Sequence, residues 1–154
     1  MRQKLSSVTL INVAFFVFII VVLGFFAGYK PLIGPLFILL GLFTLTPLWV
    51  GRDFHLSSSF SDVLFGIIDN GIFIVSALVG ADLAGVLGAI VGGAVGNAIS
   101  DAVGGIFEGE FAKQMEKRGI LQQRTALQSS IGKLSGCLLG AGLVLLVLWT
   151  ILGL

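Results

Sequence analysis

Two groups of polar residues lie inside the longest apolar stretches of this sequence. Asp69 is followed directly by Asn70 in the first stretch. In the second, Asn97 precedes Ser100 by three positions and Asp101 by four. A carboxylate in a bilayer core costs several kcal/mol, so such residues are rare in membrane spans and usually functional. All these side chains offer oxygen, which Ca²⁺, Mg²⁺ and Na⁺ prefer as a ligand. The residue types therefore predict an intramembrane cation site.

The spacing of these residues supports one site. Residues three and four apart share a helix face, so Asn97 and Asp101 lie together with Ser100 at the edge. Glu108 continues this face toward the end of the stretch, and we include it as a residue at the entrance to the site. Two carboxylates can balance one divalent ion, or take up protons or two monovalent ions in its place. Such an exchange of charge is what an antiporter requires.

Other interpretations of the same residues stay open. Asp69 and Asp101 could be protonated and hydrogen-bonded to the neighbouring Asn side chains, which would only hold helices together. An ion pair with Lys133 is a second structural option. Asp62 lies seven residues before Asp69 and shares its helix face, but its place near the end of the stretch predicts a solvated, interfacial role. No His or Cys joins the group, which argues against Zn²⁺ or Cu⁺.

The composition predicts an all-α integral membrane protein. The chain has 154 residues, of which 56% are hydrophobic and 11% charged, and its mean hydropathy is +1.09. A span needs about 20 mostly apolar residues, and five runs qualify: roughly 8–28, 32–50, 60–79, 83–107 and 130–153. We interpret residues 1–59 as two scaffold spans and 60–154 as a three-span core, with a turn at 80–82 and a polar cytoplasmic segment at about 108–129. The lipid bilayer and metal cations are the expected partners. The net charge of +1 does not favour nucleic acid.

The basic residues predict that the N-terminus is cytoplasmic. With that orientation, only Lys30 of the nine Lys and Arg residues lies outside, in agreement with the positive-inside rule. The first run is as long as a span and lacks a small-residue cleavage site, so it is expected to be an uncleaved helix. No Arg- and Ser-rich transit segment precedes it. We therefore expect a multi-pass protein of a prokaryotic plasma (inner) membrane.

Glycine is the second informative feature, because the 22 glycines are not scattered. Small residues recur every four positions over 84–104 and 132–140, a spacing that lets helix backbones approach closely. This pattern predicts a Gly-rich bundle and favours a homodimer. Gly-rich helices can also break and present carbonyl groups to an ion. Residues 92–93 and 104–105 are the expected break points.

Three motifs resemble the transmembrane protein 65 family. They are F-G-I-I-D-N at 65–70, G-N-A-I-S-D at 96–101, and G-K-x-x-G-C at 132–137 with Gly140. The likeness covers roughly residues 60–150. Animal members are mitochondrial inner-membrane proteins linked to sodium-dependent calcium export, so the resemblance implies a cation transporter, such as a Na⁺/Ca²⁺ exchanger. It implies site roles for Asp69, Asn70, Asn97 and Asp101. This chain differs from the animal proteins in its two additional N-terminal spans and its missing transit peptide.

Together these features predict a secondary transporter that exchanges Ca²⁺ for Na⁺ or H⁺, with the ions as substrates and no cofactor. A divalent cation channel or uniporter for Mg²⁺ or Ca²⁺ could use the same acids. A non-transporting membrane organiser is the third possibility. We do not expect an enzyme, because the sequence offers no nucleophile–base pair and no His-containing metal-ligand set.

Overall fold

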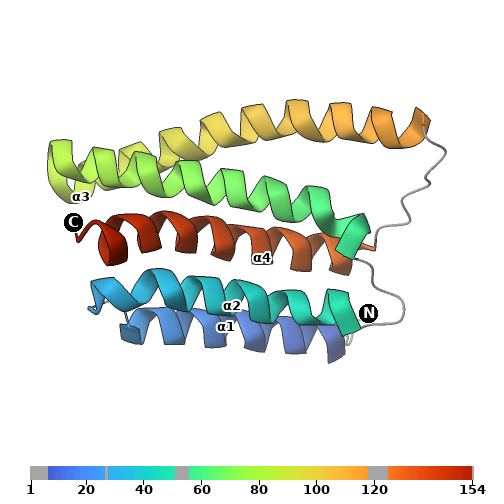
Figure 1. Ribbon diagram of the computed structural model, residues 1–154, viewed down its shortest axis with the longest axis horizontal. Coiled ribbons are helices and arrows are strands. Elements are labelled where there is room, and N and C mark those ends of the chain that lie inside the picture. The colour runs from blue at the N-terminus through green and yellow to red at the C-terminus, as the bar shows by residue number, and fades with distance from the viewer. Residues whose placement is uncertain (1–6, 27, 51–55, 118–124, 154) are drawn as a thin grey trace, which may run out of the picture.

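The structure is a bundle of long helices that run side by side (Figure 1). This computed structural model describes residues 7–26, 28–50, 56–117 and 125–153. The helices are α1 (Ser7–Phe26), α2 (Lys30–Val50), α3 (Leu56–Lys117) and α4 (Ala126–Leu145), which continues into the π-helix η1 (Leu146–Ile151). The described ranges contain no strand. The expected all-α fold is therefore confirmed.

Two stretches of the described residues are long and apolar enough to cross a membrane. They are Ser59–Phe107, which lies within α3, and Ala126–Ile151, which comprises α4 and η1. Shorter apolar helices cover Val17–Phe26 and Lys30–Thr46. The lengths and compositions of these helices suit a membrane-associated protein.

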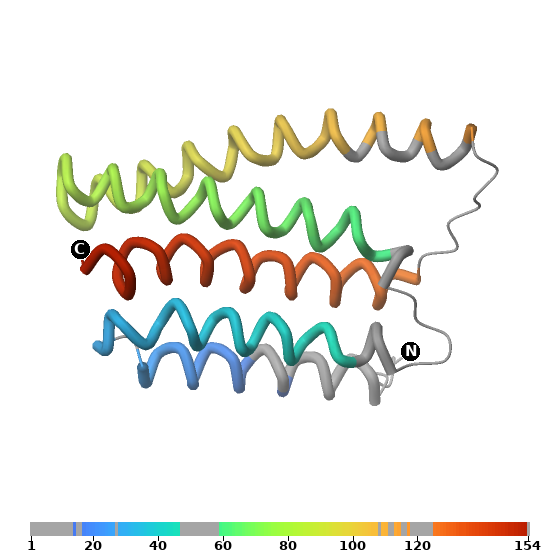
Figure 2. Tube along the Cα trace, in the orientation of Figure 1, coloured from blue at the N-terminus to red at the C-terminus, as the bar shows by residue number. Residues whose placement is uncertain are grey.

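Helix α3 is a hairpin of two helical arms. Ala84 (φ −146°, ψ 27°) and Gly85 (φ 59°, ψ −139°) are the non-helical residues inside it. Glycine adopts a positive φ without the steric cost that a Cβ atom would bring. We call residues 56–83 the first arm and residues 86–117 the second arm. The turn expected at 80–82 is helical instead, and the chain reverses a few residues later, at the tip of the hairpin in Figure 2.

Glycines allow the two arms to touch. A Cβ atom on Gly88 would overlap the carbonyl oxygen of Gly80, and one on Gly92 would overlap that of Ser76. The four-residue spacing of small residues therefore serves close packing, as predicted, but this packing lies within one chain and does not by itself argue for a dimer. The expected helix breaks at 92–93 and 104–105 are wrong, because the second arm is continuous there.

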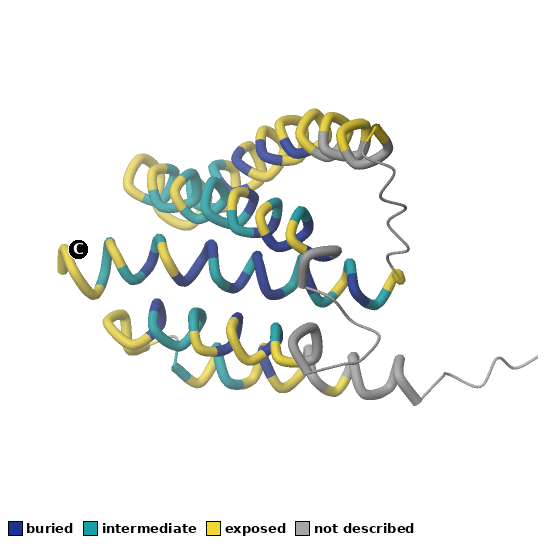
Figure 3. Tube along the Cα trace, turned by 45° about the vertical axis from the view of Figure 1, so that its right-hand side comes forward, coloured by how far each residue is buried: buried dark blue, intermediate teal, exposed yellow. Residues whose placement is uncertain are grey.

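Helix α4 lies between α2 and the first arm of α3 (Figure 1). On one side, a Cβ on Gly136 would overlap the carbonyl oxygen of Val63. On the other side, Thr44 Oγ1 and Ser135 Oγ share a buried hydrogen bond of 2.6 Å. A capping box at Thr125 begins α4. Figure 3 shows that buried residues are concentrated on α4, whereas much of the second arm is exposed.

Helix α1 completes the bundle by packing against α2. Ile19 of α1, Leu40 of α2 and Leu138 of α4 form a buried hydrophobic cluster. The second arm lies on the far side of the first arm from α4, at the edge of the bundle in Figures 1 and 3. The second arm and α1 are thus at opposite edges of the bundle.

The hairpin contacts predict different effects of two glycine substitutions on stability. Gly88→Ala should lower the free energy of unfolding by roughly 1–3 kcal/mol, because the added methyl group meets the backbone of Gly80. Gly109→Ala is the control in the same arm, since nothing lies within 4 Å of its Cβ position. It should leave stability unchanged or raise it by up to about 1 kcal/mol. Thermal unfolding in detergent, followed by circular dichroism, measures both. Equal effects would contradict the close contact between Gly88 and Gly80.

Candidate functional site

Asp69 and Ser100 meet between the two arms of the hairpin. The Asp69 side chain comes from the first arm and is 9% exposed, and Ser100 comes from the second arm and is 1% exposed. Ser100 Oγ donates a hydrogen bond to Asp69 Oδ1. The same hydroxyl lies 3.0 Å from the carbonyl oxygen of Asn97. Because the arms are antiparallel and joined by a short turn, the two residues lie at a similar distance from the tip of the hairpin, as the sequence predicts.

Asn70 points in another direction and braces the first arm against α4. Its Nδ2 donates a hydrogen bond of 3.0 Å to the carbonyl oxygen of Cys137. That contact matches the structural interpretation of the polar residues, in which an amide holds two helices together. In this conformation the Asn70 amide nitrogen is engaged with α4 rather than with Ser100.

Asn97 and Asp101 form a second polar pair on the outer side of the second arm. Asn97 Nδ2 donates a 3.0 Å hydrogen bond to Asp101 Oδ2, and both residues are exposed. One residue along an α-helix corresponds to a rotation of about 100°. With Ser100 directed at the first arm, Asp101 must therefore lie to the side of the contact with Asp69.

The described side chains among the six predicted site residues lie in three different places. Asp69 and Ser100 form a buried contact, Asn70 binds α4, and Asn97 and Asp101 lie on the outer surface. The Glu108 side chain is outside the described structure. Among the residues that the structure describes, no group of three or more His, Cys, Asp or Glu residues is placed to hold a metal ion.

Asp62 is a buried acid to which the sequence interpretation gave a solvated, interfacial role, and that interpretation is wrong. Its side chain is 1% exposed and accepts a 3.0 Å hydrogen bond from Ser129 Oγ of α4. The absence of a side chain on Gly132 makes room, since a Cβ there would lie 2.9 Å from the Asp62 Cβ. The seven-residue spacing from Asp69, two helical turns, was the signal that Asp62 faces the bundle.

Lys133 brings a positive charge to the same end of the hairpin. It is half-buried on α4, and its Nζ lies 5.0 Å from the centre of the Phe65 ring on the first arm. A cation over an aromatic face is attracted by the ring quadrupole. The edge of the same Phe65 ring packs against the backbone of Gly104 on the second arm. Phe65 therefore contacts both neighbours of the first arm.

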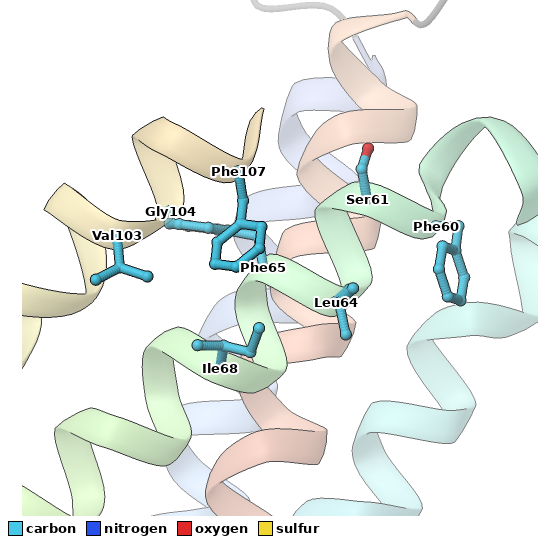
Figure 4. A pocket seen from close by; sticks show the side chains of 8 residues that line it. All are labelled: Phe60, Ser61, Leu64, Phe65, Ile68, Val103, Gly104 and Phe107. Carbon is cyan, nitrogen blue, oxygen red and sulfur yellow. The ribbon is translucent and has the colours of Figure 1, made fainter. Parts of the chain in front are cut away.

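A small apolar cavity of about 110 Å³ separates the arms near Phe65 (Figure 4). Its lining residues are Phe60, Ser61, Leu64, Phe65, Ile68, Val103, Gly104 and Phe107. Ile68 directly precedes Asp69, and Gly104 lies one turn beyond Ser100. Asp69 and Ser100 themselves do not line the cavity, and its walls offer almost no polar group to an ion.

The chemistry available at this position is that of hard oxygen ligands. Asp69 offers a carboxylate and Ser100 a hydroxyl, both buried. The pair of Asn97 and Asp101 offers a second carboxylate with an amide.

No protein-family model, curated protein or solved structure matches this chain.

The burial of Asp62 predicts a large loss of stability when its carboxylate is removed. Asp62→Ala leaves Ser129 without its acceptor inside the bundle, so the free energy of unfolding should fall by about 1–3 kcal/mol. Asp82→Ala removes an exposed carboxylate near the hairpin turn and should change it by less than about 0.5 kcal/mol. Chemical unfolding in detergent measures both variants. A harmless Asp62→Ala would mean that this residue faces solvent.

Proposed function

We propose that this chain is a multi-pass membrane protein that moves cations by secondary transport, exchanging Ca²⁺ for Na⁺ or H⁺. The observation that carries the proposal is the carboxylate of Asp69, buried between two apolar helical arms with the Ser100 hydroxyl as its hydrogen-bond donor. A buried carboxylate is costly to keep in hydrocarbon and marks ion pathways in membrane proteins. Its oxygen chemistry suits a hard cation.

The proposed topology has five spans: α1, α2, the two arms of α3, and α4 with η1. The N-terminus would be in the cytoplasm, and the membrane would be the plasma (inner) membrane of a prokaryote. Lys113 and Lys117 end the second arm, whereas Lys30 lies at the start of α2. This arrangement agrees with the positive-inside rule. The motif resemblance to the transmembrane protein 65 family supports cation exchange as the activity.

In the proposed mechanism, Asp69 neutralises the transported ion and Ser100 contributes a hydroxyl oxygen. Binding requires the Ser100 proton to turn away from Asp69, so the ion and the interhelical hydrogen bond compete for the same carboxylate oxygen. Loss of the ion, or protonation of Asp69, restores the contact between the arms. The occupancy of the site is thereby coupled to the separation of the two helices.

The second arm is the element best placed to move. The first arm is fixed to α4 by close backbone contacts at Gly66 and Gly136 and by the hydrogen bond from Asn70. The second arm joins the first through the non-helical residues Ala84 and Gly85. Rotation there would open the Asp69–Ser100 contact without disturbing α4.

One observation favours a non-transporting organiser as the second candidate function. Asn70 donates to the Cys137 carbonyl, and Thr44 and Ser135 share a hydrogen bond, so polar side chains join helices at two places in the bundle. A membrane organiser would need no ion and would use Asp69 in the same way. A divalent cation channel would share the site but need no counter-ion.

Replacement of Asp69 separates these functions. In proteoliposomes, the wild-type chain should take up Ca²⁺ when a Na⁺ gradient is imposed, and Asp69→Asn should reduce this uptake to the level of empty vesicles. The amide keeps the size of the side chain and can still accept a hydrogen bond from Ser100. Asp82→Asn is the matched control, an exposed Asp near the hairpin turn that should transport normally.

Three results would change the assignment. Uptake that is independent of any counter-ion gradient would indicate a channel or uniporter. Wild-type protein that neither binds nor moves Ca²⁺, Mg²⁺ or Na⁺ would favour the organiser. Full activity in a correctly folded Asp69→Asn variant would remove Asp69 from the transport path.

A further inference from the structure

Lys133 places a positive charge between the two buried acids of the first arm. Its Nζ lies 5.0 Å from the centre of the Phe65 ring. Phe65 comes three residues after Asp62 and four residues before Asp69. Residues at these spacings are neighbours on one face of a helix. The ammonium group thus lies, along the first arm, between the levels of the two carboxylates.

The packing of α4 against the first arm fixes this position. A Cβ on Gly66 would overlap the carbonyl oxygen of Lys133 and the amide nitrogen of Cys137. The Cys137 carbonyl also accepts the hydrogen bond from Asn70, which directly follows Asp69. The charges of Asp69 and Lys133 both act on the Cys137 thiol. These contacts hold Lys133 beside the segment that carries the proposed ion site, so an ion bound there is within reach of its charge.

We propose that Lys133 sets the ion selectivity of the Asp69 site by repelling a bound cation in proportion to the charge of that cation. The proposal rests on the proposed function, which supplies the ion. The Coulomb energy between Lys133 and a bound ion doubles from Na⁺ to Ca²⁺, and it is screened only weakly between packed helices. Lys133 therefore weakens the binding of Ca²⁺ more than that of Na⁺. An exchanger needs this balance, because Na⁺ must displace an ion with twice its charge.

A direct ion pair between Lys133 and Asp69 would act differently. The amine would then compete with every ion for one carboxylate, and its removal would strengthen Na⁺ and Ca²⁺ binding by the same factor. In the structure the amine lies over the Phe65 ring, and the Asp69 carboxylate accepts a hydrogen bond from Ser100. The attraction between the ammonium group and the ring holds the charge near the site without occupying the carboxylate.

Removal of the Lys133 charge tests the proposal. Lys133→Met keeps an unbranched side chain and should strengthen Na⁺ binding by roughly threefold to tenfold. Ca²⁺ binding should strengthen by the square of that factor, roughly tenfold to a hundredfold. Calorimetry in nanodiscs measures Ca²⁺ binding directly and Na⁺ binding through its competition with Ca²⁺. Alkaline pH is used because protons compete least for Asp69 there.

Two variants serve as controls. Lys133→Arg keeps the charge, so both affinities should stay close to those of the wild type. Lys30→Met removes a lysine with the same kind of contact, since the Lys30 Nζ lies 5.7 Å from the centre of the Trp149 ring. Trp149 is in η1, after the end of α4, whereas Lys133 is near the start of α4. Lys30→Met should therefore change neither affinity.

A second variant keeps the test decisive if Lys133→Met does not fold. In a Cys137→Ser background, Lys133→Cys carries the single thiol of the chain. Aminoethyl methanethiosulfonate then restores a positive charge at this position, and methyl methanethiosulfonate adds a neutral group. The neutral product should bind both ions more tightly than the charged product, and the ratio for Ca²⁺ should be the square of the ratio for Na⁺.

The outcomes separate this proposal from the proposed function. Equal factors for the two ions would mean that the amine pairs directly with Asp69, and they would overturn the proposal. Unchanged or weakened binding in a folded Lys133→Met variant would also overturn it. If the wild-type protein binds both ions with affinities independent of Lys133, only this role of Lys133 is rejected. If the wild-type protein binds neither ion, the transport function is rejected together with it.

Discussion

The hydrogen bond from Ser100 to Asp69 depends on the close approach of two helices that are apolar almost everywhere else. A short side chain such as Ser reaches across only when the backbones nearly touch, and Gly92 and Gly96 permit this by removing the side chains that would intervene. The contact gives the carboxylate a hydrogen-bond donor, without which its burial among apolar side chains would be costly. The close approach that the glycines permit is therefore also what allows Asp69 to be buried with a hydrogen-bond donor.

The glycines bring each arm of α3 close to a different neighbour, the first arm to α4 and the second arm to the first. Gly136 and Gly140 of α4 let the first arm approach so closely that their missing side chains would strike its backbone. The opposite side of α4 is tied to α2 by the Thr44–Ser135 hydrogen bond. The second arm lies beside the first arm, on the side away from α4, in Figures 1 and 3. Any ion that loosens the Asp69–Ser100 contact would act on this arm first.

Much of the fold follows from the sequence, because apolar length and small-residue spacing are local signals. They predict the helices, the hairpin and the approach of Asp69 to Ser100. The position of the reversal is missed by a few residues, since several glycines could supply a turn and tertiary packing selects Gly85 with its positive φ. The burial of Asp62 is missed for a related reason, since it depends on the space above Gly132 in a helix about 70 residues away in sequence.

The separation of Asp69 from Asp101 is the result that sequence spacing alone could not give. Residues 97, 100 and 101 share a broad helix face, so spacing alone allows all of them to meet the first arm. The glycines of the second arm lie against the first arm, and Ser100 is on the same side of the helix as they are, so it faces Asp69. Asp101 is then rotated by about 100° toward the surface. Because the second arm turns only one face toward the first, the packing that buries Asp69 against Ser100 leaves Asp101 exposed.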